Sequence, residues 1–133
     1  MKASGKIIRN EFDWGAIEWL ANREVGNAKE LSVARMVLRP GMATDAHVHA
    51  NCEEAIYVVH GMVECRTGRR LVKLRTGGQS VVPRGAVHRI KNAGTTPAEV
   101  ILSYSSAARE FTLAPSDPSS QRFTIRAAMP PLA

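Results

Sequence analysis

The sequence predicts an all-β domain, built as a barrel or a sandwich of short strands. Turn signals rich in Gly, Pro and Asn recur at intervals of roughly 8–12 residues, between runs of apolar and β-branched residues. The sequence predicts no long helix, and it contains no internal repeat of roughly 20–50 residues. A chain of 133 residues has the length of one domain with its own core.

The expected elements begin with an extended arm over 1–11 and a strand with an irregular middle over 12–20. The strands that follow are expected over 30–38, 43–49, 54–60, 62–66, 70–75, 79–82, 88–91 and 98–104. Asn92-Ala-Gly94 indicates a hairpin between the last two of these strands.

The chain divides into an N-terminal arm with strands over 1–29, a barrel over 30–113, and a C-terminal linker and tail over 114–133. The tail opens with a stretch that is too polar and too rich in proline to pack. Residues 121–126 are a candidate last strand, on this barrel or on a neighbouring subunit.

Composition favours a globular protein that does not cross a membrane. Apolar residues make up 44% and charged residues 23%, and no apolar run approaches the roughly 20 residues that a bilayer span requires. The N-terminal residues lack the apolar segment of a secretory signal, so we expect a cytoplasmic location.

The net charge of +6 and the pI of about 9.9 raise the question of nucleic acid as a partner. The charge is densest over 66–75, where basic and apolar residues alternate around Thr67-Gly68 as on the solvated face of a strand pair. Aromatic residues for base stacking are few, at 5% of the chain. We therefore expect no nucleic-acid partner.

Cys52 and Cys65 have no CxxC spacing, and both are expected to be free thiols. Cys52 follows His49 by three residues. It is either a small buried spacer or an oxidisable thiol near the candidate site described next.

Two histidines one residue apart, His47 and His49, are the first sign of a metal site. Side chains at positions i and i+2 of a strand point to the same face, so both can reach one ion. Glu53 or Glu54 offers a carboxylate, and His88 follows a Pro83-Arg-Gly85 bend that can aim it inward. Three imidazoles and a carboxylate suit one divalent Fe, Mn, Ni, Co or Zn ion.

The link over 50–53 is expected to reverse the chain, so that the strand opening at Glu54 pairs with the strand carrying His47 and His49. The carboxylate then lies across from the histidines. His60, the remaining histidine, precedes the Gly61 turn and is expected to be exposed.

The spacing of these residues resembles the two conserved motifs of the cupin superfamily. The first motif runs from a glycine through His-x-His and Glu to a second glycine, and it is matched by Gly41, His47, His49, Glu54 and Gly61. The second runs from a glycine through Pro-x-Gly and His to Asn, and it is matched by Gly77, Pro83, Gly85, His88 and Asn92. The distance to Gly61 in the first motif favours Glu54 over Glu53.

The resemblance implies a cupin-type double-stranded β-helix, that is, a jelly-roll barrel. It also implies one bound metal ion and a homodimer, because members of the family often exchange N-terminal strands. Its members include dioxygenases, decarboxylases, isomerases, lyases and non-catalytic binding proteins.

Two hypotheses follow for the function. The first is a metal-dependent enzyme acting on an oxygen-rich small molecule such as a keto or hydroxy acid, a uronate or a phenolic compound, with dioxygenase-like chemistry ahead of isomerase or lyase chemistry. The second is a non-catalytic protein that binds a metal or a small ligand.

Three further residues are candidate catalytic groups. Asp45 is two residues before His47, so on a strand both side chains point to the same face. Asp45 is either a general base in the pocket or a solvated loop residue. Arg35 either points inward to hold a substrate carboxylate or points outward into solvent. Tyr104 is a candidate acid or hydrogen-bond donor, and Ile56, Val58 and Ile90 are expected to line the pocket.

Overall fold

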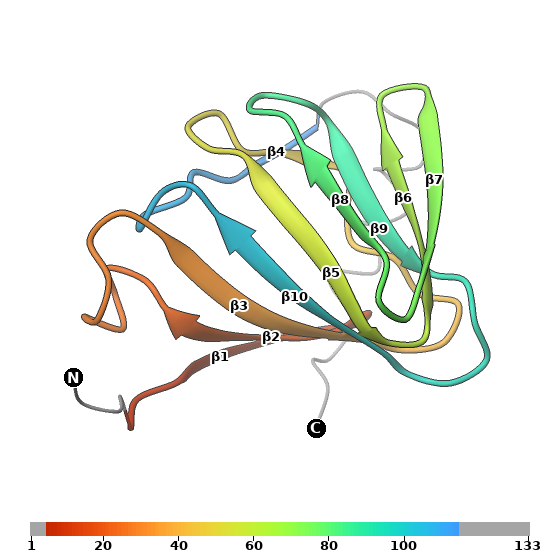
Figure 1. Cartoon of the computed structure of the whole chain (residues 1–133), viewed down its shortest axis with the longest axis horizontal. Coiled ribbons are helices and arrows are strands. Elements are labelled where there is room, and N and C mark those ends of the chain that lie inside the picture. Colours follow the sequence, from red (N-terminus) through yellow and green to blue (C-terminus); the bar gives the residue numbers. More distant parts are fainter. Residues whose placement is uncertain (1–4, 115–133) are drawn as a thin grey trace.

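The computed structural model describes residues 5–114, and every regular element in that part of the chain is a β-strand (Figure 1). The strands are β1 (Ile8–Phe12), β2 (Gly15–Ala21), β3 (Ser32–Leu38), β4 (His47–Val48), β5 (Glu54–His60), β6 (Met62–Thr67), β7 (Arg70–Arg75), β8 (Gln79–Val82), β9 (His88–Asn92), β10 (Ala98–Tyr104) and β11 (Thr112–Leu113). The prediction of an all-β fold is therefore confirmed.

The strands form two antiparallel sheets that enclose one core. The six-stranded sheet has the order β1-β2-β3-β10-β5-β8, and the five-stranded sheet has the order β11-β4-β9-β6-β7. Both sheets contribute side chains to the same buried cluster, among them Leu38, Ile56, Val63, Ile90 and Leu102. This shared core closes the two sheets into a barrel (Figure 1).

Alternation of buried and exposed residues explains the strand boundaries. Along β3 and β10 alternate side chains are fully buried, as expected where one face of a sheet covers a core. The bounds of β5, β7, β8 and β10 agree with the predicted ranges. The arm over 1–29 does not stand apart, since β1 and β2 extend the same sheet as β3.

Two predicted connections are wrong in the same way. The 50–53 link does not pair neighbouring strands, because β4 lies in the five-stranded sheet and β5 in the six-stranded sheet. Asn92-Ala-Gly94 is not a hairpin turn, because β9 and β10 also lie in different sheets. Both segments carry the chain across the barrel.

Two predicted strands also differ from the structure. The range 12–20 contains a turn at Asp13-Trp14 that makes β1 and β2 a hairpin. Over 43–49 only β4 is regular, because the hydroxyl of Thr44 accepts the hydrogen bond of the Ile90 N–H in place of a backbone carbonyl.

Asn92 joins the crossing segments. Its side chain is completely buried, and its amide donates hydrogen bonds to the carbonyls of Leu38 and Thr96 while its oxygen accepts one from the Gly94 N–H. Satisfying every polar atom of this buried amide fixes the end of β9, and with it the strand that begins at His88.

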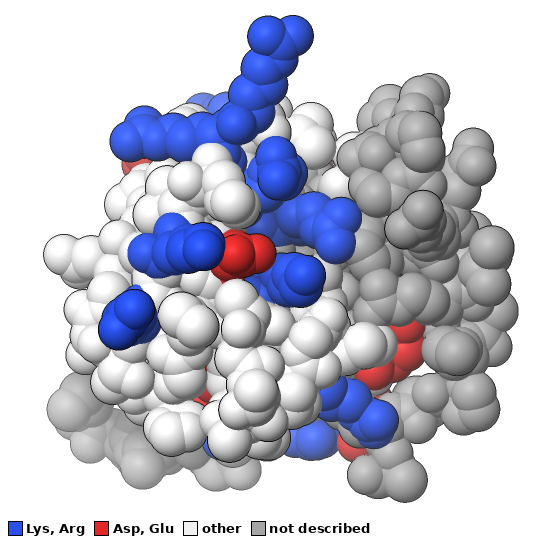
Figure 2. Space-filling model, turned by 90° about the vertical axis from the view of Figure 1, so that its right-hand side faces the viewer, with Lys and Arg blue, Asp and Glu red and all other residues white. Residues whose placement is uncertain are grey.

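Basic side chains lie on the side of the molecule formed by β6, β7 and β9, interspersed with acidic ones (Figure 2). A shallow depression there is lined by Glu64, Arg66, Leu71, Arg89 and Lys91. Because β7 is an edge strand, its exposed Arg70, Lys73 and Arg75 hinder pairing with another sheet edge.

Two expectations concern other parts of the chain. The candidate strand over 121–126 lies outside the described residues. Within residues 5–114 there is no helix long and apolar enough to cross a membrane.

Candidate metal centre

The structure brings His47, His49, Glu54 and His88 together inside the barrel. His47 on β4 pairs in register with His88 on β9, and His49 follows β4 by one residue. Glu54 opens β5 in the opposite sheet. The two sheets therefore supply different kinds of ligand, imidazoles from one side and the carboxylate from the other.

The four side chains are buried and close enough to share one ion. Their relative exposure is 7% or less, and one ligand atom from each lies within 4.8 Å of the others. Glu54 Oε1 lies 3.0 Å from His49 Nε2 and 3.2 Å from His88 Nε2. A divalent ion with imidazole and carboxylate ligands fits a cluster of this size and composition.

Backbone carbonyls hold all three imidazoles in one tautomer. The Nδ1 atoms lie 2.6 Å from the Asp45 carbonyl for His47, 2.8 Å from Glu110 for His49 and 2.9 Å from Ala86 for His88. A carbonyl can only accept, so each Nδ1 carries the hydrogen. Each neutral ring then presents the lone pair of Nε2 to the centre, as in protein metal sites.

His49 provides a direct test of whether a metal fits. Its Nε2 is buried and makes no hydrogen bond within the described chain, because the hydrogen is on Nδ1 and the carboxylate of Glu54, 3.0 Å away, is also an acceptor. Buried polar atoms are rarely left without a partner. A cation at the centre would satisfy this nitrogen together with the other three ligands.

Burial and charge set the protonation states of the cluster. Burial lowers the pKa of His47 to about 3. Burial also lowers the pKa of His88, but the contact with the Glu54 carboxylate, its negative charge and the hydrogen bond to the Ala86 carbonyl all favour the protonated ring, and together they raise the pKa above the usual value. Burial raises the pKa of Glu54, but contacts with His49 and His88 reverse this and lower it to about 2, so the carboxylate stays ionised.

The structure separates the residues that the sequence left as alternatives. Glu54 is 1% exposed and lies in the cluster, whereas Glu53 is exposed and His60 lies outside it. Cys52 is buried and burial raises the pKa of its thiol, which favours the role of a packed spacer.

A cavity of about 60 Å³ adjoins His47 and Glu54. Asp45 and Tyr104 line it, as the sequence suggested, together with Ile90. Burial and the negative charge of Glu54 raise the pKa of Tyr104 well above 10, so the phenol remains a hydrogen-bond donor. Ile56 and Val58 pack in the core instead of lining this cavity.

The candidate role of Arg35 in the pocket is wrong. Its side chain lies on the partly exposed face of β3. There the guanidinium forms ion pairs with Glu99 and, at 2.9 Å, with Glu18. The buried neighbours Ala34 and Met36 face the core. Arg35 therefore holds three strands of the six-stranded sheet together on its outer side.

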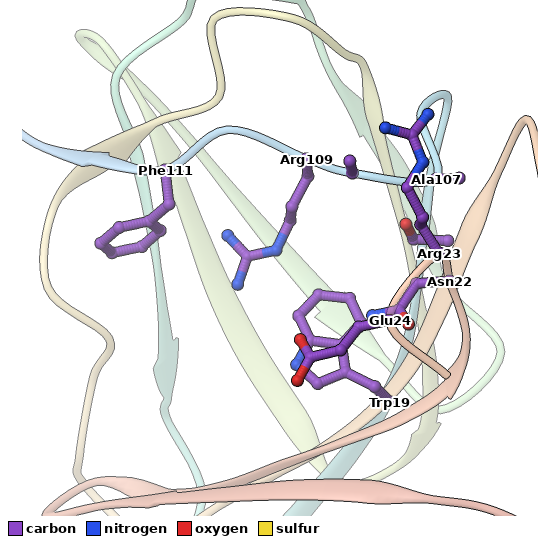
Figure 3. Close-up of a pocket in the computed structure, with 9 residues that line it drawn as sticks. Trp19, Asn22, Arg23, Glu24, Ala107, Arg109 and Phe111 are labelled. Carbon is purple, nitrogen blue, oxygen red and sulfur yellow. The ribbon is translucent and has the colours of Figure 1, made fainter. Parts of the chain in front are cut away.

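Sequence reasoning missed Arg109 and Phe111, which follow β10. Phe111 stacks on His47 with ring centroids 4.9 Å apart, and both residues line the cavity at the ligands. They also line a larger neighbouring cavity of about 510 Å³ (Figure 3). Arg109 is 60 residues from His49, and no spacing rule connects the two.

A two-sheet antiparallel barrel with three buried histidines and one carboxylate defines a β-barrel protein with the ligand set of a transition-metal centre. The chain belongs to the cupin family, because the profile described as "Cupin domain" matches residues 34–104.

Similar proteins share this domain but are longer. A germin-like protein of subfamily 2 from Arabidopsis thaliana is 34% identical over 85 residues, covering 60% of this chain and 39% of its own. Germin-like protein 1-1 from Oryza sativa subsp. japonica is 36% identical over 106 residues, covering 70% and 49%. The chain thus spans less than half the length of these relatives.

Solved structures show the same fold. An oxalate decarboxylase from Lactobacillus farciminis, in a formate complex, superimposes with a TM-score of 0.75 at 23% identity, over 80% of this chain and 33% of its own. An oxalate oxidase superimposes with a TM-score of 0.69 at 24% identity, over 77% and 56%. The predicted jelly-roll fold is confirmed.

Replacing a ligand should remove the metal. We expect His88→Ala to lower metal content from one ion to near zero per chain and to lower the melting temperature, because the ion ties strands of both sheets together. Elemental analysis and thermal melting measure both effects. His60→Ala is the matched control and should keep its metal; full occupancy in His88→Ala would refute the ligand assignment.

Metal affinity should fall with decreasing pH. Below the raised pKa of His88 a proton competes with the metal, so we expect the dissociation constant to rise about tenfold per pH unit. Glu54, with a pKa of about 2, stays ionised and does not contribute above pH 5. Calorimetric titrations from pH 8 to pH 5 measure this, and a constant affinity would contradict histidine ligation.

Proposed function

We propose that the protein is a metal-dependent enzyme acting on an oxygen-rich small molecule, with dioxygenase-like chemistry ahead of isomerase or lyase chemistry. The single observation that carries this proposal is the cavity beside the four ligands. It reaches His47 and Glu54 directly, so a small molecule inside it would touch the metal centre.

The size and lining of this cavity favour a compact reacting group. A volume of about 60 Å³ has room for a few non-hydrogen atoms or waters. Most of its lining is apolar, with side chains such as Trp14, Ile17 and Met36. This lining limits the access of bulk water to the reacting atoms.

The metal ligands, Tyr104 and Asp45 would each have a distinct role in the proposed reaction. A first-row transition metal held by His47, His49, Glu54 and His88 would supply Lewis-acid or redox chemistry at a coordinated oxygen. Tyr104 would donate a hydrogen bond to a substrate oxygen, because its phenol stays protonated. Asp45 would accept a proton from a substrate hydroxyl at the edge of the cavity.

The relatives add support for this class of reaction. The structures that resemble this chain include oxalate decarboxylases and an oxalate oxidase, and one of them is described with Mn(II) centres. Those proteins act on a small carboxylic acid. We therefore place keto and hydroxy acids first among the substrates to screen.

A non-catalytic binding protein is the alternative. It would use the same four ligands to bind a metal or a small ligand without turning it over. The larger cavity beyond Arg109 does not distinguish the two functions, because a pocket of this kind also serves a binding protein.

Purified without chelators, the protein should contain one transition-metal ion per chain and consume oxygen with a keto or hydroxy acid. We expect chelation or His47→Ala to reduce turnover by at least about a hundredfold, because an active-site metal can supply several kcal/mol. Oxygen uptake and product analysis across reconstituted metals measure this. Stoichiometric metal without any turnover would favour the binding protein.

We also propose a homodimer. The exposed side chains of Tyr57, Val59 and Val81 lie near the β8 edge of the six-stranded sheet, where a second copy would cover them. Sedimentation equilibrium should give twice the 14.5 kDa chain mass. Val81→Glu should shift the mass toward one chain, and a monomeric wild type would remove the proposal.

A further inference from the structure

Arg109 lies where two cavities meet. It lines both the 60 Å³ cavity at the metal ligands, which we call the inner cavity, and the 510 Å³ cavity, which we call the outer groove. In Figure 3 its guanidinium is directed into the space between Phe111 and Trp19. A molecule extending from the groove toward the ligands would pass this side chain.

Aromatic rings hold the guanidinium in place. Its central carbon lies 4.7 Å from the ring centroid of Trp19, 5.2 Å from that of Tyr104 and 5.3 Å from that of Phe111. These contacts favour the charged group and shield it from water.

The backbone around Arg109 is also anchored. The side chain of Asn51 donates a hydrogen bond to the Ala108 carbonyl and accepts one from the Glu110 N–H, at 3.0 and 2.9 Å. The residues on either side of Arg109 are thus fixed to the loop that follows His49. A side chain held at both its backbone and its tip is preorganised for binding.

Within residues 5–114, Arg109 nevertheless lacks a carboxylate partner and an acceptor for its Nε–H. Its Nε is buried without a hydrogen bond, and no carboxylate of residues 5–114 lies within 4.0 Å of the guanidinium. Nη1 lies 3.3 Å from His49 Nδ1, but that nitrogen already donates to the shorter contact at Glu110. Arg35, by contrast, is paired with two carboxylates.

Ring stacking alone does not account for this arrangement. Stacking satisfies the face of a guanidinium but leaves its in-plane N–H groups without acceptors, and a buried unsatisfied donor of a charged group is costly. An anion in the plane of the guanidinium would satisfy both the donors and the charge.

We propose that Arg109 binds the carboxylate of the substrate. The substrate class is a monocarboxylic acid whose body occupies the outer groove and whose oxygen-bearing reacting group enters the inner cavity. The position of the reacting group rests on the proposed function, whereas the binding of the carboxylate does not. This class favours keto acids, hydroxy acids and uronates over phenolic compounds that lack a carboxylate.

A carboxylate matches the site better than a phosphate. One unpaired cation surrounded by aromatic rings balances one negative charge, and the planar fork of the guanidinium fits the two oxygens of a carboxylate. A phosphate dianion would leave a second negative charge uncompensated among apolar groups.

The test measures binding of 3-phenylpropionate to the purified protein under nitrogen by titration calorimetry. We expect Arg109→Gln to weaken binding about tenfold to a hundredfold, because it removes a charge-assisted pair of hydrogen bonds. The affinity of Arg109→Lys should lie between those of the wild type and Arg109→Gln, since lysine keeps the positive charge but lacks the two parallel N–H donors of the guanidinium. The Nε–H resonance of Arg109 should also shift on adding the ligand.

Matched probes and variants isolate the carboxylate. 3-Phenylpropan-1-ol has the same body without the charge, and acetate has the charge without the body; both should bind at least about tenfold more weakly than 3-phenylpropionate. Arg69→Gln removes an exposed arginine in the β6–β7 turn and should bind as the wild type does. Thermal melting verifies that each variant is folded.

Several results would overturn the proposal. They are unchanged binding in a folded Arg109→Gln variant, tighter binding of inorganic phosphate than of 3-phenylpropionate, or loss of binding in Arg23→Gln at the groove rim instead. Binding lost in His88→Ala but kept in Arg109→Gln would place the carboxylate on the metal. If Arg109 binds the probe but no metal-dependent turnover is found, the proposed function fails and this inference stands.

Discussion

Three imidazoles and a carboxylate lie inside the barrel with their ligand atoms within 4.8 Å of one another, and their arrangement depends on three hydrogen bonds to backbone carbonyls. Those carbonyls belong to Asp45, Ala86 and Glu110, in segments far apart along the chain. Asp45 and Ala86 each precede their own histidine by two residues, whereas Glu110 is 61 residues from His49, so the orientation of His49 requires a distant segment to be in place. The cluster is complete only when both sheets and the segment carrying Glu110 have come together.

The same segments connect the metal centre to the space around it. The stretch that provides the Glu110 carbonyl also carries Arg109 and Phe111, and Asn51 anchors it to the loop after His49. The position of the positive charge at the groove is thus linked to the orientation of a ligand. In the proposed binding mode, the small inner cavity and the larger outer groove would select for size, and Arg109 would select for charge.

Local sequence signals predicted strands better than connections. The predicted ranges 54–60 and 98–104 match β5 and β10, because turn residues mark where each apolar run ends. Turn residues over 50–53 and 92–94 show where a strand ends. They do not show which sheet the next strand joins, because that choice depends on packing between the sheets. Thr44 likewise interrupts a predicted strand through a contact with Ile90 that no local pattern reveals.

The sequence by itself determined the ligand types and their spacing, including His47, His49 and His88, because a metal site needs specific donor atoms and these leave a pattern along the chain. Only the tertiary structure decided that Glu54 meets them from the opposite sheet, and that Arg35 is paired with carboxylates on the outer side of its sheet. It also decided that Arg109 lies at the cavity with no carboxylate partner among residues 5–114. Whether an arginine finds a carboxylate depends on residues distant in sequence. Such contacts arise only when both sheets have closed around the core.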